Sequence, residues 1–135
     1  MYILDTNAVS ALMKGTPAVV DRLTALAPDE VAIPQPVIAE IAFGIERLPR
    51  SKRRTFLQAR FDLVSAGLRR VDWTDAVSLA FGRTKALLER RGMRIEDFDA
   101  AIAAHALALE ATLVTANLDH MIRVPGLRVE DWSRG

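Results

Sequence analysis

The chain has 135 residues, half of them apolar and 26% charged, which is typical of one globular domain spanning residues 1–135. It contains no cysteine, which excludes disulfide scaffolds, thiolate metal sites and cysteine nucleophiles, so any metal site must use oxygen or imidazole ligands. The net charge of +1 does not by itself indicate a nucleic acid or a membrane as partner.

Short apolar segments alternate with helical patterns in the first half of the chain. Residues 2–4 are an apolar run that stops at Asp5, which predicts a strand leading into a helix. Residues 17–27 and 37–48 carry apolar side chains at helical spacing, on either side of a buried strand predicted at 31–33.

The same alternation continues in the second half, where Ser and Thr caps and Gly stops mark the helix ends. The sequence predicts, in order, a helix at 51–67, a strand at 68–71, helices at 74–92 and 98–109, and strands at 112–115 and 127–129. Strands separated by helices rather than by tight hairpin turns indicate parallel pairing. We therefore expect a single-domain α/β fold, with a short central parallel sheet and helices on both of its faces.

Four polar residues are expected at one edge of this sheet, where ligands bind outside the carboxyl ends of parallel strands. Asp5 follows the first strand, and Asn117 comes two residues after the strand ending at Thr115. Glu40 and Asp99 lie in helices expected to flank the same edge. The sequence thus predicts three carboxylates and one amide close together.

Each acid also has an ordinary structural interpretation. Asp5 fits a turn and Asp99 a helix cap, while Glu40 fits a solvated charge lying roughly 115° from the apolar direction of its helix. Three carboxylates at one edge would nevertheless raise one another's pKa, which is tolerated chiefly when a hard divalent cation lies between them. Taken together, the acids favour a metal site.

Five segments resemble a known family, in order along nearly the whole chain. They are MYILDTN (1–7), VIAEIAFGI (37–45), DAAIAAHA (99–106), TLVTAN (112–117) and VPGLRVEDW (124–132). They are similar to the PIN domain, a small metal-dependent ribonuclease fold. The length and the ending also resemble the stand-alone VapC-type toxins of bacterial type II toxin-antitoxin pairs.

The resemblance implies that Asp5, Glu40 and Asp99 are the acids of the metal site. It places Asn117 at a fourth position that is often Asp, and the nearby Asp119 could compensate for this neutral residue through a water. It further implies an endoribonuclease that uses Mg²⁺, for which Mn²⁺ can substitute. A small antitoxin protein as partner and a homodimer are also implied.

All-oxygen ligands suit Mg²⁺ or Mn²⁺, which lower the pKa of a bound water that can attack a phosphodiester. Asp5 and Asp99 are the expected primary ligands, and Glu40 is a ligand or orients the attacking water. The hydroxyls of Thr6 and Thr115 are expected to support them. By resemblance, the products carry 5′-phosphate and 3′-hydroxyl ends.

A basic run follows the helix of Glu40, and its ordinary interpretation is a solvated surface. Alternatively it forms a rim that guides RNA phosphates. The run comprises Arg47, Arg50, Lys52, Arg53, Arg54 and Arg60. A second basic set, which leads toward Asp99, comprises Arg83, Lys85, Arg90, Arg91 and Arg94.

Several other conspicuous side chains are expected to be structural. Trp73, Trp132 and His105 are interpreted as core or rim residues rather than as groups that act on a substrate. His120 lies in a loop near the site edge, and its role stays open. Asp97 is close to Asp99 but does not begin the small-residue helix, so Asp99 is preferred.

Two rival functions remain at this stage. One is a phosphotransfer or phosphatase domain with Asp5 as nucleophile, although position 7 is Asn rather than the second Asp such a domain needs. The other is a catalytically weak binding module whose acids only cap helices. The longest segment without Asp, Glu, Lys or Arg has ten residues, 100–109, too few to cross a membrane. No signal peptide is visible, so a cytoplasmic location is expected.

Overall fold

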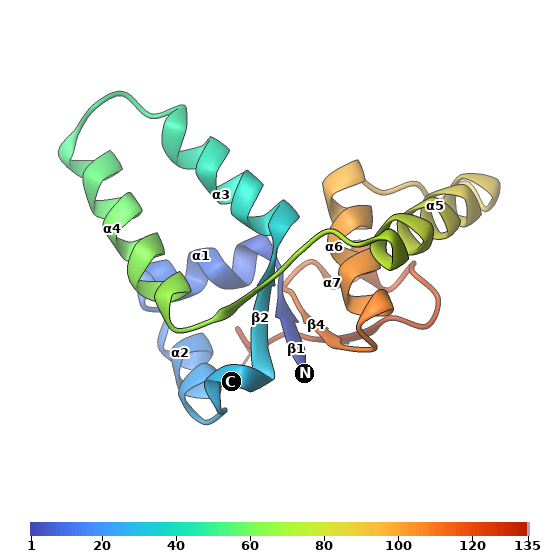
Figure 1. Cartoon of the computed structure of the whole chain (residues 1–135), viewed down its shortest axis with the longest axis horizontal. Coiled ribbons are helices and arrows are strands. Elements are labelled where there is room, and N and C mark those ends of the chain that lie inside the picture. The colour runs from blue at the N-terminus through green and yellow to red at the C-terminus, as the bar shows by residue number, and fades with distance from the viewer. Residues whose placement is uncertain (135) are drawn as a thin grey trace.

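Five short strands form one parallel sheet, with helices packed on both of its faces (Figure 1). The computed structural model describes residues 1–134. The strands are β1 (Tyr2–Leu4), β2 (Val31–Pro34), β3 (Arg69–Val71), β4 (Thr112–Val114) and β5 (Arg128–Glu130). The helices are α1 (Thr6–Lys14), α2 (Pro17–Thr24), α3 (Gln35–Glu46), α4 (Lys52–Ala66), α5 (Asp75–Arg90), α6 (Asp97–Ala108) and α7 (Leu118–Met121), and one 3-10 turn, η1 (Pro28–Glu30), precedes β2.

The strand order is β3-β2-β1-β4-β5, and every neighbouring pair is parallel. The first strand of the chain is therefore the central strand of the sheet. Ile3 pairs with Ala32 on one side and with Leu113 on the other, and all three side chains are fully buried. This arrangement confirms the expected α/β class, and it gathers the carboxyl ends of all five strands at one edge.

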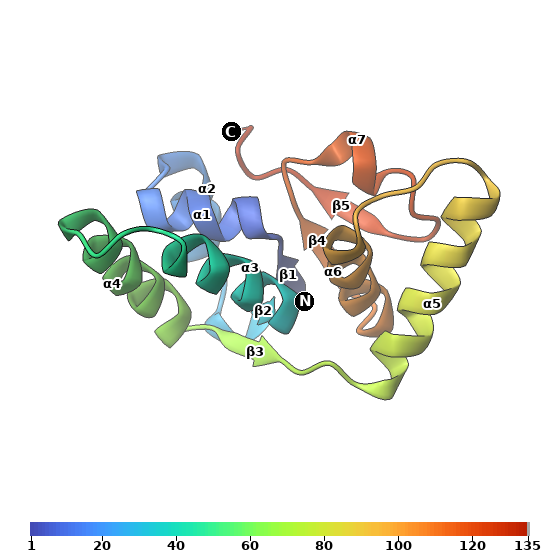
Figure 2. The same cartoon turned by 90° about the horizontal axis from the view of Figure 1, so that it is seen from above.

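The helices lie in two groups, with α1 to α4 on one side of the strands and α5 and α6 on the other (Figure 2). Helix α6 contacts both β1 and β4. Its residues Ala100–Ala106 are all buried, and most of them are alanines. Small side chains let a helix approach the sheet closely, so α6 brings Asp99 near Asp5, the residue that follows β1.

The structure differs from the sequence expectations mainly at element ends. Helix α3 begins at Gln35 rather than at residue 37, with Pro36 in its first turn, where the missing N–H has no helical partner to lose. Strand β5 lies one residue later than the expected 127–129. The short elements η1 and α7 were not predicted, because three or four residues are too few to show a hydrophobic period. No helix within residues 1–134 has the length and apolar character needed to span a membrane.

Both tryptophans act as packing residues, as expected. Trp132 is fully buried against Tyr2, with a ring-centroid distance of 5.4 Å, and the guanidinium of Arg22 lies 5.5 Å from its ring. Trp73 is partly exposed, and its ring meets His105 edge-on at a centroid distance of 5.4 Å.

His105 is fully buried in α6, which confirms it as a packed residue. Its Nδ1 lies 2.8 Å from the carbonyl of Ala101, so Nδ1 carries the proton and donates it. Within the described residues its Nε2 has no hydrogen-bond partner. Burial lowers the pKa of His105, although the bond to Ala101 opposes this shift. The folded state therefore keeps this imidazole neutral.

We expect His105→Leu to become progressively more stable than the wild type as the pH falls below about 6.5. In the wild type the unfolded chain takes up a proton on His105 as the pH falls below about 6.5, while the folded chain resists it, so stability decreases. Leucine cannot take up a proton, so the variant lacks this loss of stability at low pH. It also lacks the buried, unpaired Nε2, so its free energy of unfolding at pH 7.5 should be unchanged or slightly higher. Urea unfolding of both proteins between pH 5 and 8 tests this prediction, and parallel curves would contradict it.

Candidate active site

Asp5 is held at the end of β1 by three hydrogen bonds. Its Oδ1 accepts from the backbone N–H of Thr6 at 2.7 Å, which caps α1. Its Oδ2 accepts from the hydroxyl of Thr115 at 2.7 Å and from the side-chain amide of Asn7 at 3.2 Å. Burial raises the pKa of Asp5, and these hydrogen bonds partly offset the rise. The carboxylate is thus fixed in position and poorly solvated.

Asn7 ties the ends of β1 and β4 together, a role that sequence reasoning missed. Its amide nitrogen also donates to the Thr115 hydroxyl at 3.2 Å, and its side-chain oxygen accepts from the backbone N–H of Ala116 at 2.9 Å. The Thr115 oxygen in turn accepts from the backbone N–H of Asn117 at 2.9 Å. The signal in the sequence was that Asn7 comes two residues after Asp5, at the end of β1, where its side chain can reach the end of the neighbouring strand β4.

Glu40 reaches the same edge from α3. It is half-buried, and its Oε1 accepts a hydrogen bond of 2.6 Å from the Thr6 hydroxyl. Thr6 therefore contacts both acids, because its backbone N–H bonds Asp5 and its hydroxyl bonds Glu40. The two carboxylates are linked through one residue at the start of α1.

Asp99 completes the acidic group from the first turn of α6. Its pKa is raised to about 6, first by burial and then by the negative charges of Asp5 and Glu40. The charge of Glu96 adds to this shift, and His120 opposes it. The structure thus brings Asp5 and Glu40 close enough to Asp99 for their charges to disfavour its ionisation.

The donor set fits a hard divalent cation. It offers carboxylate, hydroxyl and amide oxygens, the ligand type that Mg²⁺ and Mn²⁺ prefer. Among residues 1–134, no three Asp, Glu, His or Cys side chains converge closely enough to form a complete metal site by themselves. This agrees with the habit of Mg²⁺ to keep several waters and to bind through one or two carboxylates together with phosphate oxygens.

Within residues 1–134, no hydrogen bond joins the side chains of Asn117, Asp119 or Asp97 to this group. Asn117 is half-buried at the start of α7, and its side chain makes no capping bond. Asp119 is exposed on α7 and is absent from the charges that act on Asp99. Asp97 turns away, because its carboxylate lies 3.0 Å from Lys85 Nζ.

Comparison with known protein families matches residues 2–127 to the PIN domain. The chain belongs to the PIN domain family. Among curated proteins it is 33% identical over 136 residues to Ribonuclease VapC2 of Rickettsia felis, covering 99% of both chains. It is 28% identical over 131 residues to the tRNA(fMet)-specific endonuclease VapC of Salmonella typhimurium, covering 97% of both. The crystal structure of VapBC2 from Rickettsia felis bound to a DNA fragment from their promoter matches with a TM-score of 0.88 and 32% identity, covering 97% of this chain and 98% of that one.

Most of the basic run of this PIN domain lies around the tip between α3 and α4, at the end of α3 remote from α6 (Figure 1), whereas Arg60 lies farther along α4. Arg54 forms an ion pair with Glu46 at 2.7 Å, and its guanidinium also donates a hydrogen bond to the Leu48 carbonyl at 3.2 Å. Arg60 donates to the Met13 carbonyl at 2.9 Å. Arg54 and Arg60 therefore stabilise the fold, while the other four side chains of the run are exposed.

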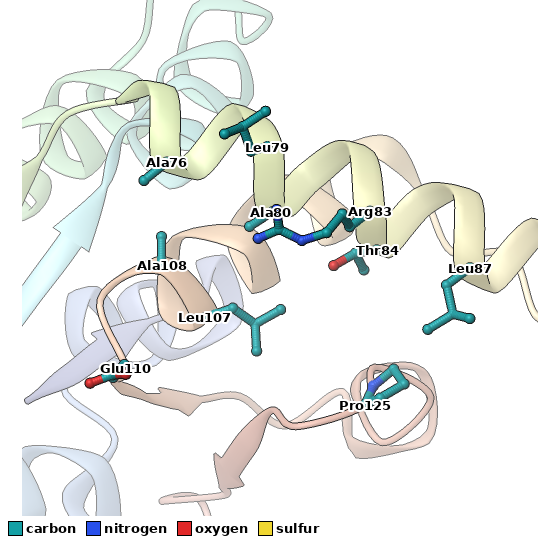
Figure 3. Close-up of a pocket in the computed structure, with 10 residues that line it drawn as sticks. All are labelled: Ala76, Leu79, Ala80, Arg83, Thr84, Leu87, Leu107, Ala108, Glu110 and Pro125. Atoms are coloured by element: carbon teal, nitrogen blue, oxygen red, sulfur yellow. The ribbon is translucent and has the colours of Figure 1, made fainter.

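A separate hollow of the PIN domain lies between α5 and the carboxyl end of α6 (Figure 3). It is lined mainly by apolar side chains such as Leu79, Leu87 and Leu107, with Arg83 and Glu110 at its margin. Because Leu107 is near the end of α6 and Glu110 precedes β4, this hollow faces the amino ends of the strands. It is therefore distant from the acidic group.

Proposed function

We propose that this PIN domain is an endoribonuclease that acts as the toxin of a type II toxin-antitoxin pair and that its activity requires a divalent cation, Mg²⁺ or its substitute Mn²⁺. Its relatives support RNA cleavage, because they are named as a ribonuclease and as a tRNA endonuclease at full coverage. The likeness to VapBC2 supports an antitoxin protein as partner.

The observation that carries the proposal is that Asp5 and Glu40 both accept hydrogen bonds from Thr6 and lie close enough to Asp99 for their negative charges to act on it. Such a group is unfavourable by itself, as the raised pKa of Asp99 indicates. A cation supplies the missing positive charge and, when bound, lowers the pKa of a water and offsets charge on the phosphodiester. The function therefore explains why the fold keeps an electrostatically costly arrangement.

Each residue has a specific role in this proposal. Asp5 and Asp99 hold the cation, and Asn117 contributes a neutral amide oxygen at the fourth position. Glu40 is a ligand or orients the attacking water through its free oxygen, since its Oε1 accepts from Thr6. Thr115 and Thr6 fix the carboxylates of Asp5 and Glu40 by hydrogen bonds of 2.7 Å and 2.6 Å. The chain itself provides no nucleophile.

The partners follow from the same proposal. The exposed basic residues Arg47, Arg50, Lys52 and Arg53 are available to RNA phosphates or to acidic groups of an antitoxin. A homodimer would cover large exposed apolar side chains on the first-half helices, including Phe43, Phe56 and Leu63. We place the protein in the cytoplasm, where RNA is available.

The alternative in which Asp5 is a phosphoryl acceptor has no supporting observation. Both of its oxygens accept hydrogen bonds, and Asn7 occupies the position where a second Asp would be needed. Failure to trap a phosphoaspartate on this residue is the expected result.

The decisive experiment couples RNA cleavage to cation binding. Purified protein should cleave labelled RNA with Mg²⁺ or Mn²⁺ and not with EDTA, leaving 5′-phosphate ends. A cation at about 100 times its dissociation constant should raise the free energy of unfolding by about 2.7 kcal/mol, because the unfolded chain lacks the site. Cleavage that persists in EDTA would refute the cation dependence, and an equal stabilisation of Asp99→Asn by the cation would refute the assignment of Asp99 to a shared cation site.

A further inference from the structure

Beside the acidic group lies a second, polar hollow that the proposed hydrolysis does not use. Its volume is about 530 Å³, and it is lined by Arg94, Ile95, Glu96, Asp97 and His120. The charges of Glu96 and His120 both act on Asp99. The hollow therefore opens directly next to the cleavage site.

The walls of this hollow are tied to the rest of the fold. The guanidinium of Arg123, which follows α7, donates to the carbonyl of Arg94 at 3.0 Å. On the other wall, Lys85 of α5 pairs with Asp97 at 3.0 Å, which offsets the charge of that acid. Ile95 packs against the hydrophobic core and gives the hollow an apolar floor.

Three polar side chains in the hollow have no partner within the protein. Across residues 1–134, no hydrogen bond or ion pair involves the side chains of Arg94, Glu96 or His120. Glu96 occupies the N-cap of α6 but makes no side-chain capping bond, although this position normally takes Ser, Thr, Asp or Asn for that purpose. Both carboxylate oxygens of Glu96 are therefore free to accept hydrogen bonds from a ligand.

We infer that this hollow binds the nucleotide next to the scissile phosphate and that it prefers an unpaired guanine. The inference rests on the proposed ribonuclease function. Guanine is the base that offers one carboxylate two adjacent N–H donors, at N1 and N2, and Glu96 is a free carboxylate. Arg94 supplies donors for a phosphate, and the His120 ring and Ile95 provide surfaces on which a base can stack.

The test uses four seven-nucleotide RNAs that differ only in a central G, A, C or U between uridines. Binding is measured by fluorescence anisotropy in EDTA, and initial cleavage rates are measured separately with Mg²⁺ or Mn²⁺. The wild type should bind the G-containing RNA about tenfold more tightly than the others. Glu96→Gln should reduce this preference to less than about twofold, because its NH2 group replaces one acceptor oxygen and places a donor opposite a guanine N–H. Ratios between RNAs are compared, so a general change in activity cancels.

Matched variants separate base reading from charge. Glu110→Gln makes the same charge change at the other edge of the sheet and should keep the guanine preference. Arg94→Gln should weaken all four RNAs equally and reduce the slope of log affinity against log salt by about 0.7. Arg91→Gln, in the same loop but outside the hollow, should have a smaller effect.

Two results overturn this inference without touching the proposed function, namely equal binding of the four RNAs or a guanine preference that survives Glu96→Gln. Absence of cleavage of all four RNAs and of structured RNA, with either cation, would overturn the proposed function itself.

Discussion

Replacing Asp99 with asparagine should lower the rate of RNA cleavage by about a thousandfold, because loss of a cation ligand costs several kcal/mol and each 1.36 kcal/mol is about tenfold in rate. The same change should make the protein without cation more stable at pH 7.5. The pKa of Asp99 is raised to about 6, so its ionised form opposes folding. A shift of two pKa units corresponds to about 3 kcal/mol, which solvent screening reduces to roughly 1–2 kcal/mol for a half-buried group.

The sign of the pH dependence provides an independent check. In the wild type, Asp99 should contribute increasing stability as the pH falls from above about 6 toward 4, because the folded chain binds the proton more readily than the unfolded chain. Asp99→Asn should remove this contribution. Asp75→Asn is the matched control, since Asp75 lies in the first turn of α5, as Asp99 lies in the first turn of α6, and is outside the acidic group. A large loss of cleavage in this control, or retained cleavage in Asp99→Asn, would contradict the assignment.

Truncation of Ile102 should cause the largest loss of stability, by about 2 to 5 kcal/mol for Ile102→Ala. Ile102 is fully buried one turn after Asp99, in the helix that packs on β1 and β4. Its neighbours on α6 are mostly alanines, which cannot extend to fill the cavity. The loss would remove a large share of the total stability of a domain of this size, which is about 5 to 15 kcal/mol.

Urea unfolding at pH 7.5 without cation measures this effect. The dependence of the free energy of unfolding on urea concentration should be the same for both proteins. Leu79→Ala removes a similar volume from an exposed position on α5 and should cost less than about 0.5 kcal/mol. Equal losses for the two variants would show that α6 is not the packing centre of the fold.

The fold was largely predictable because β1, β2 and β4 are short, mostly apolar runs and most of the longer helices carry apolar residues at helical spacing. The small residues of 99–106 correctly indicated a helix packed close to the sheet. The predicted start of α3 was two residues too late, because Pro36 was interpreted as a boundary before the helix although a proline also fits the first helical turn. Helix α7 was missed because its four residues cannot show a period, although it carries His120 beside the site.

The candidate site was predictable in composition but not in its internal contacts. The positions of Asp5 and Asp99 followed from strand ends and a helix start, and the intermediate burial of Glu40 agrees with its angle on the helix. The bonds of Asn7 to Asp5 and Thr115 join residues far apart in the chain. Such bonds depend on side-chain rotamers at facing strand ends, which no local pattern specifies.

The central position of β1 has a consequence for how the protein is made. Asp5 leaves the ribosome early, but its hydrogen-bond partner Thr115 lies 110 residues later. At about 5 to 20 residues per second, translation separates the two by roughly 5 to 20 s. Until β4 emerges, β1 lacks one neighbour and Asp5 lacks the Thr115 hydroxyl. The hydrogen bonds that fix the Asp5 carboxylate are therefore complete only after most of the chain has been synthesised.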